Sequence, residues 1–139
     1  MTDAVRRLVA RTSYLTGALA VVLSPIPLAD EVALLPVFGV MTGRIAKTHG
    51  LKLREVPWRP IARTTVAALA ARATVNVAVS YIPGVAAVAN AASAVTVTRM
   101  LGSYIDGACV EPSLARPLSV RDIIDRMKQA VSGPPKVAI

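Results

Sequence analysis

The sequence predicts an all-α fold, in which two hydrophobic helical hairpins form a four-helix bundle and a short amphipathic helix follows at the C-terminus. Residues 73–98 carry no charge and are interrupted only at Pro83 and Gly84. Pro83 lacks the N–H that a helix needs and Gly84 tolerates a positive φ, so together they predict a turn between two helices. Pro25 and Pro27 interrupt an earlier apolar stretch in the same way.

Composition bounds the class of protein. The 139 residues are enough for one domain with a real core, 54% of them are hydrophobic and the mean hydropathy is +0.55. A chain this apolar either buries its excess apolar surface in an oligomer interface or inserts that surface into a membrane. The net charge of +8 predicts an anionic partner, which could be lipid headgroups, nucleic acid or an acidic protein. Nucleic acid is the weaker choice, because no aromatic residues are interleaved with the basic ones.

The first hairpin opens with a basic leader, Met1 to Arg11, which contains the membrane-surface candidates Arg6, Arg7 and Arg11. An apolar run from Tyr14 to Leu23 follows it. After the turn, Asp30 marks a helix N-terminus, where an acid complements the helix dipole, and this second helix is predicted over residues 29–48.

The second helix carries two glycines with the spacing of a close helix contact. Gly39 and Gly43 are four residues apart, which allows two helices to approach closely if the segment lies in lipid. The alternative is that they are simply two tolerated glycines.

In the second hairpin, Asn76 and Asn90 each lie seven residues from Pro83. If the arms are antiparallel, the two amides meet, which is what a polar group in apolar surroundings needs. Arg72, Asn76 and Ser80 recur every four residues and form one polar stripe. We therefore take Arg72, Asn76 and Asn90 as helix-contact residues.

The connector between the hairpins holds a single tryptophan. Trp58 lies between Arg54 and Arg59, a neighbourhood expected at a membrane surface, although a tryptophan that covers the edge of a core is the alternative.

Beyond residue 111 the long apolar stretches end, and a second part of the chain begins. Residues 1–111 are predicted to form the hydrophobic helical domain, and residues 112–139 a linker, an amphipathic helix and a flexible Pro-rich tail. Ser119 and Asp122 have the spacing of a capping box at the start of that helix.

The placement of charge predicts an orientation. Lys and Arg gather at the N-terminus, around residues 44–63 and after residue 116, whereas neither hairpin turn contains one. In a bacterial membrane the basic ends would therefore be cytoplasmic and the turns would point inward or across. Each arm of the first hairpin has only about 12 strongly apolar residues, or ~18 Å of helix, against a hydrocarbon core of ~30 Å. Shallow, re-entrant or wedge-like insertion fits this length.

Several motifs together resemble the bacterial domain-of-unknown-function family no. 697. They are Pro25 to Asp30, Leu34-Leu35-Pro36, Arg44 to Gly50, Tyr81-Ile82-Pro83-Gly84 and Thr98 to Gly102. The resemblance covers roughly residues 14–107 and implies a hydrophobic helical module linked to Era-like or dynamin-like GTPases. The chain has no G-x-x-x-x-G-K-[ST] loop, so a GTPase partner would act in trans.

Neither catalysis nor a cofactor is predicted. Cys109 is the only cysteine and His49 the only histidine, and neither has a catalytic or metal-binding partner nearby in sequence. The favoured function is a non-enzymatic, membrane-associated and self-associating protein that anchors or recruits a partner, at the bacterial inner membrane or its cytoplasmic face. The alternatives are a cytoplasmic protein that oligomerises into a shell, ring or filament, and a pore-forming inserter.

Overall fold

Helices make up most of the chain. The computed structural model describes residues 1–24, 26, 28–82 and 85–133, and within these ranges it contains five α-helices and no strand. They are α1 (Asp3–Leu23), α2 (Ala29–Thr48), α3 (Trp58–Val79), α4 (Ala86–Val110) and α5 (Val120–Ser132). The prediction of an all-α chain is confirmed. The turn residues Pro25, Pro27, Pro83 and Gly84 and the tail after residue 133 lie outside the described residues.

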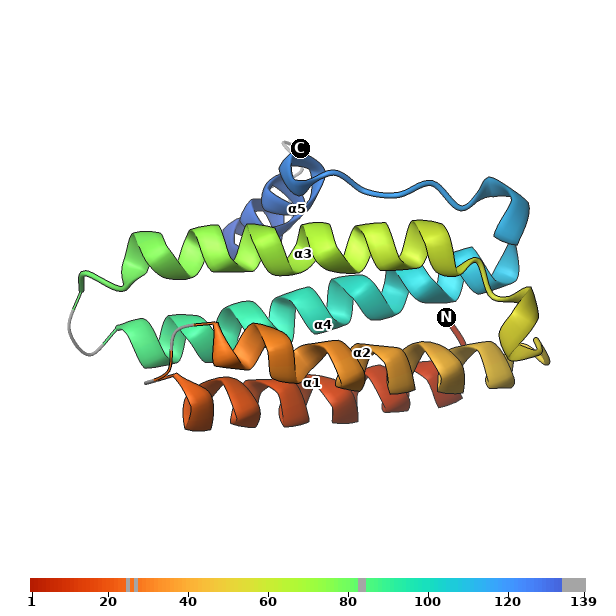
Figure 1. The fold of residues 1–139 in the computed structure, drawn as a ribbon, viewed down its shortest axis with the longest axis horizontal. Coiled ribbons are helices and arrows are strands. Elements are labelled where there is room, and N and C mark those ends of the chain that lie inside the picture. The colour runs from red at the N-terminus through yellow and green to blue at the C-terminus, as the bar shows by residue number, and fades with distance from the viewer. Residues whose placement is uncertain (25, 27, 83–84, 134–139) are drawn as a thin grey trace, which may run out of the picture.

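The four long helices lie side by side along the long axis of the molecule (Figure 1). The α1–α2 and α3–α4 connections lie at one end, and the α2–α3 connector lies at the other end. α1 makes its most extensive contact with α4, and smaller contacts join α3 to α4 and α1 to α2. The centre of the core is made of fully buried aliphatic side chains and one aromatic ring, including Leu34, Phe38, Ile45, Val97, Leu101 and Ile105.

The basic leader is part of α1 rather than a separate segment. Thr2 caps the helix, accepting a hydrogen bond from the Val5 amide at 3.3 Å. Val5 and Val9 are buried, whereas Arg6, Arg7 and Arg11 are exposed on the other side of the helix. The leader is helical because its apolar residues fall four apart, on the face that meets α4.

α2 has the predicted bounds, and a glycine follows two residues after its end at Thr48. Gly50 has a φ of 72°, a conformation that glycine adopts without strain. The Leu51 amide returns to the Ala46 carbonyl at 3.0 Å, which completes the C-terminal cap and turns the chain into the connector.

Within the bundle, the glycines at close helix contacts are Gly17 and Gly102, whereas Gly39 and Gly43 are not at such a contact. A Cβ added to Gly102 of α4 would collide with the Val9 side chain of α1, and a Cβ on Gly17 of α1 would lie 3.0 Å from Val95 Cγ2. A Cβ on Gly39 would meet nothing within 4 Å, and one on Gly43 only Leu53 Cδ2 at 3.7 Å. The close helix contact is therefore between α1 and α4, and Gly39 and Gly43 lie on the outer side of α2.

Gly102→Ala is expected to lower the free energy of unfolding by about 1 to 3 kcal/mol, because β-branched Val9 has no freedom to move aside in the core. Gly39→Ala is the matched control. It is expected to leave stability unchanged or to raise it by up to ~1 kcal/mol, since alanine favours the helix. Urea unfolding of both variants measures this, and equal effects would mean that α1 and α4 do not approach at Gly102.

α5 lies across α3 on the side of the bundle away from α1 and α2 (Figure 1). Ser119 and Asp122 form the capping box at its start, and Ile123 and Met127 are buried in the same core as the long helices. The Leu118 amide also donates to Thr64 Oγ1 on α3 at 2.9 Å. α5 therefore covers part of α3, whereas Val66 and Val77 of α3 stay exposed.

Candidate functional site

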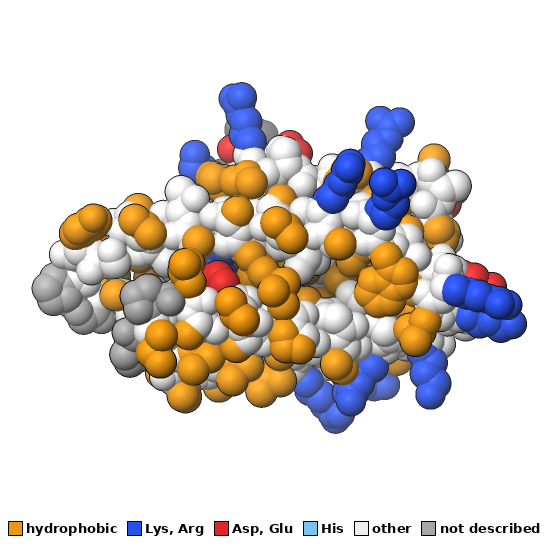
Figure 2. Space-filling model, in the orientation of Figure 1, with side chains coloured by type: hydrophobic (Ala, Val, Ile, Leu, Met, Phe, Trp, Pro, Cys, Tyr) orange, Lys and Arg blue, Asp and Glu red, His pale blue; other side chains and the backbone are white. Residues whose placement is uncertain are grey.

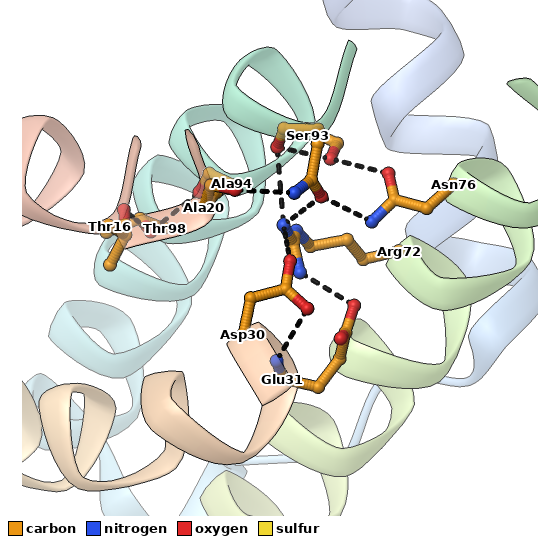
Figure 3. A network of polar contacts seen from close by, with 10 residues as sticks. Thr16, Ala20, Asp30, Glu31, Arg72, Asn76, Ser93, Ala94 and Thr98 are labelled. Atoms are coloured by element: carbon orange, nitrogen blue, oxygen red, sulfur yellow. Dashed lines mark hydrogen bonds and ion pairs between the residues drawn. The ribbon is translucent and has the colours of Figure 1, made fainter. Parts of the chain in front are cut away.

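Three charged side chains meet inside the bundle near its two turns (Figure 3). Arg72 of α3 is fully buried, and its Nη1 donates to Glu31 Oε1 and its Nη2 to Asp30 Oδ2, both at 2.7 Å. Asp30 and Glu31 lie in the first turn of α2, where the helix dipole favours acids. We call these three residues the clamp. It ties α2 to α3 with charge-assisted hydrogen bonds.

Asn90 of α4 extends the clamp to the other helices. Its Oδ1 accepts from Arg72 Nη2 and, at 2.7 Å, from Asn76 Nδ2, while its Nδ2 donates to the Ala20 carbonyl of α1 at 2.8 Å. The structure thus brings together the two amides whose symmetry about the turn predicts their contact. Ser80 of the predicted stripe does not join them, because its hydroxyl donates to the carbonyl of Val77 in its own helix.

One buried donor of the clamp has no acceptor within the described residues, and that is Arg72 Nε. A hollow of about 430 Å³ lies beside the clamp, lined by Asp30, Glu31, Asn76 and Asn90 together with two serines and apolar side chains. In the described part of the chain, no three His, Cys, Asp or Glu side chains are arranged to hold a metal ion.

The two acids of the clamp differ in proton affinity. Burial raises the pKa of Glu31 from 4.5 to about 7, with a further increase from its hydrogen bond to Asp30, and the Arg72 charge only partly offsets this. Burial also acts on Asp30, but hydrogen bonds from Glu31 and Arg72 outweigh it and lower the pKa of Asp30 to about 2. Asp30 is therefore the permanent anion that balances Arg72.

Glu31 is expected to make the protein less stable as the pH rises. Because its pKa is about 7 in the folded chain and 4.5 ordinarily, the folded state binds this proton more tightly between those values. Stability therefore falls from about pH 4.5 to about pH 7, by ~1 to 3 kcal/mol, until the folded carboxyl is ionised. Denaturant unfolding across this range measures the slope, and Glu31→Gln is expected to reduce it. An unchanged slope in the variant would assign the effect to another group.

Removing Asn90 is expected to cost more than removing Asn76. Asn90→Ala leaves Arg72, Asn76 and the Ala20 carbonyl each short of one partner, whereas Asn76→Ala affects mainly Asn90 and Ser93. We expect about 1 to 3 kcal/mol for Asn90→Ala and less for Asn76→Ala. The double variant should cost less than the sum by ~0.5 kcal/mol or more, as for residues in contact. Strict additivity in thermal unfolding would mean that the two amides act independently.

At the other end of the bundle His49 meets Asp106. His49 follows the last residue of α2, and its Nε2 lies 2.8 Å from Asp106 Oδ1 on α4. This contact joins residues 57 apart in the chain, and neither residue has a local sequence feature that indicates the other.

Charge and apolar surface are separated along the bundle. Residues 12–43 and 64–98 form the half that leads to the two turns, which we call the turn half. The sequence places only three charged residues there, and they are Asp30, Glu31 and Arg72. All three are the clamp, so their charges are paired with one another beneath the surface.

The exposed surface of the turn half is strongly apolar. On α1, α2 and the segment between them, the described residues include nine large hydrophobic side chains that are exposed: Tyr14, Leu15, Val21, Val22, Ile26, Leu28, Val32, Leu35 and Val40. We call this set the apolar face. Hydrophobic side chains crowd this part of the molecule in Figure 2, below the Lys and Arg side chains of α3 and α5. Val77, Tyr81, Ile82, Val85 and Val88 continue this surface around the second turn.

Exposed arginines flank the apolar face on both helices. Arg11 lies about 12 residues before the end of α1, or ~18 Å along the helix. Arg44 lies about 15 residues after the start of α2, or ~22 Å from it. The exposed surfaces of the two helices therefore change from apolar to basic at similar distances from the first turn.

The predicted membrane-surface residues divide into two groups. Arg7 and Arg11 lie beside the apolar face, and Arg6 of the same helix is 3.9 Å from Asp3. Arg54, Trp58 and Arg59 lie in or next to the connector at the far end of the bundle. Trp58 Nε1 donates to the Leu53 carbonyl at 2.7 Å, which fixes the indole to the connector.

Comparison with models of protein families, with curated proteins and with solved structures finds no match to the chain. The resemblance to family no. 697 stays a hypothesis that rests on its motifs. None of the described helices combines the length and the apolar character needed to cross a bilayer.

Proposed function

We propose that the protein is a non-enzymatic membrane-docking module that inserts its apolar face and two turns into one leaflet of an anionic bilayer. The observation that carries the proposal is the separation of charge: the turn half has a broad apolar surface, and its three charged residues are paired inside it. An exposed apolar surface of this extent marks an interaction site.

The proposal takes the long helices as two hairpins, α1–α2 and α3–α4, with their turns leading into the lipid. The ~18 Å between the end of α1 and Arg11 is close to the ~15 Å thickness of one hydrocarbon leaflet. Full insertion of α1 would thus bring Arg11 to the phosphates. Because α5 crosses α3 and exposes charged residues there, the bundle docks tilted, with α1 and α2 toward the lipid. The anionic cytoplasmic face of a bacterial inner membrane suits this arrangement.

The clamp lowers the free-energy cost of inserting the charged residues of the turn half. A lone charge at the bilayer centre costs ~2.5 to 3.5 kcal/mol on insertion scales. The charge of Arg72 is already paired with Asp30 and Glu31 through its two terminal nitrogens, and protonation of Glu31 leaves Asp30 and Arg72 as a neutral pair.

A tryptophan reporter tests the docking. Tyr81 is 84% exposed at the second turn, so Tyr81→Trp places an indole in the surface that is proposed to insert. With vesicles that contain brominated anionic lipid, we expect quenching of this new indole and little quenching of Trp58 in the wild type. Binding should rise with anionic lipid and weaken with salt. Absence of binding, or stronger quenching of Trp58, would overturn the proposal.

The second candidate is a soluble assembly in which copies of the chain cover one another's apolar faces. The same exposed apolar side chains favour it. Light scattering of lipid-free protein separates the two candidates: a stable closed oligomer that does not bind vesicles would support the assembly.

A further inference from the structure

Three arginines surround a hollow at the outer junction of α1 and α2. Arg7 and Arg11 are one helical turn apart on α1, and Arg44 faces them from α2. The hollow measures about 330 Å³, and the residues that line it include no Asp or Glu. Within the described residues none of the three arginines forms an ion pair, whereas their neighbour Arg6 lies near Asp3. The hollow is thus a concave site of unbalanced positive charge, which attracts anions.

An apolar groove continues from this hollow between the same two helices. It measures about 310 Å³ and shares Leu8, Thr12, Leu15 and Arg44 with the hollow. Its other lining residues are Pro36, Val37, Val40 and Met41 of α2. A ligand that fills both spaces has an anionic end and an apolar tail.

The two spaces also have a direction. Along α1 the order is Arg7, Arg11 and then Leu15, toward the first turn, and along α2 Arg44, Val40 and Pro36 run toward the same turn. The apolar groove therefore leads from the arginines into the turn half. If the turns enter a leaflet, a lipid held here has its phosphate at the surface and its chain parallel to its neighbours.

We propose that this hollow and groove form a binding site for a single anionic phospholipid, with the phosphate on Arg7, Arg11 and Arg44 and one acyl chain in the groove. Guanidinium groups bind phosphate oxygens bidentately, which favours arginine over lysine at such a site. The inference rests on the proposed membrane docking, to which it adds a defined ligand class and position.

A short-chain lipid tests the site without a bilayer. Dihexanoyl phosphatidic acid below its micelle concentration is titrated into the wild-type chain and followed by calorimetry. The variant Arg7→Gln/Arg11→Gln/Arg44→Gln is expected to bind at least about tenfold more weakly, which is about 1.4 kcal/mol. The control Arg54→Gln/Arg59→Gln/Arg116→Gln removes the same charge from other exposed positions and is expected to change affinity less than about twofold. Equal losses in the two variants would overturn the site.

The groove is tested separately. Val40 is exposed and lines the groove, so Val40→Trp fills the space without disturbing the core. The wild type should bind the short-chain lipid at least about tenfold more tightly than glycerol 3-phosphate, and Val40→Trp should remove this difference. Equal wild-type affinities for the two ligands would overturn the acyl-chain part. A dimer that forms across the groove and excludes the lipid would overturn the whole site.

The vesicle experiment distinguishes this inference from the proposed function. Wild-type protein that binds the short-chain lipid but not anionic vesicles would refute the docking and leave the site standing. Vesicle binding that both arginine variants weaken equally would refute the site and leave the docking standing.

Discussion

Arg72→Met is expected to lower the free energy of unfolding by about 3 to 5 kcal/mol at pH 7.5, the largest loss of any single substitution considered. The guanidinium is fully buried and donates to Asp30, Glu31 and Asn90. Methionine fills a similar volume but leaves the Asp30 carboxylate buried without its counter-ion, and burial of an unpaired charge is what costs most. Chemical unfolding measures the loss.

Two further variants separate charge from packing. Asp30→Asn/Glu31→Gln/Arg72→Met is expected to recover most of the lost stability, because no charge is then left unpaired. Arg99→Met, at an exposed position of α4, is the control and should change stability by less than ~0.5 kcal/mol. If the triple variant is no more stable than Arg72→Met, the clamp acts through shape rather than through charge.

Two charges on the apolar face are expected to lower the affinity for anionic vesicles at least about a hundredfold. Val22 and Val32 are 72% and 66% exposed, so Val22→Glu/Val32→Glu leaves the core intact. A charge at the bilayer centre costs ~2.5 to 3.5 kcal/mol, and half of that for each glutamate corresponds to a hundredfold in affinity. Vesicle co-sedimentation measures the change.

The matched control places the same charges at the opposite end of the molecule. Val110 and Leu114 are both 64% exposed, and Val110→Glu/Leu114→Glu is expected to weaken binding only by the general effect of two added negative charges. If both double variants lose affinity equally, the orientation is wrong and binding depends on net charge alone.

Local signals predict the helices and one contact beside the clamp, that between Asn76 and Asn90. Pro25 and Pro83 separate the apolar runs, and the placement of Asn76 and Asn90 about the second turn predicts their meeting. The acidic partners of Arg72 could not be found in this way. Asp30 and Glu31 lie 42 and 41 residues away, and as acids in a first turn they are already explained by the helix dipole.

The sequence also does not predict which helices pack against each other. Gly39 and Gly43 have the spacing of a contact motif but lie on the outer side of α2, whereas Gly102 meets Val9 and has no second glycine four residues away. Spacing shows which residues share a face, and only the packing of the whole bundle shows where that face points. The apolar face is hidden from sequence reasoning for the same reason, since buried and exposed aliphatic residues look alike there.

The pairing of α1 with α4 also sets the order in which the chain can acquire its structure during synthesis. About 60 residues separate the end of α1 from the start of α4, so at ~5 to 20 residues per second the ribosome needs roughly 3 to 12 s before the first residues of that partner exist. Throughout this interval Val5 and Val9 have no α4 to cover them, and α2 alone makes the smaller contact. The nascent chain therefore commits to its native core only when Leu101 and Ile105 emerge, and until then its first hairpin is open to chaperones and to any nearby membrane.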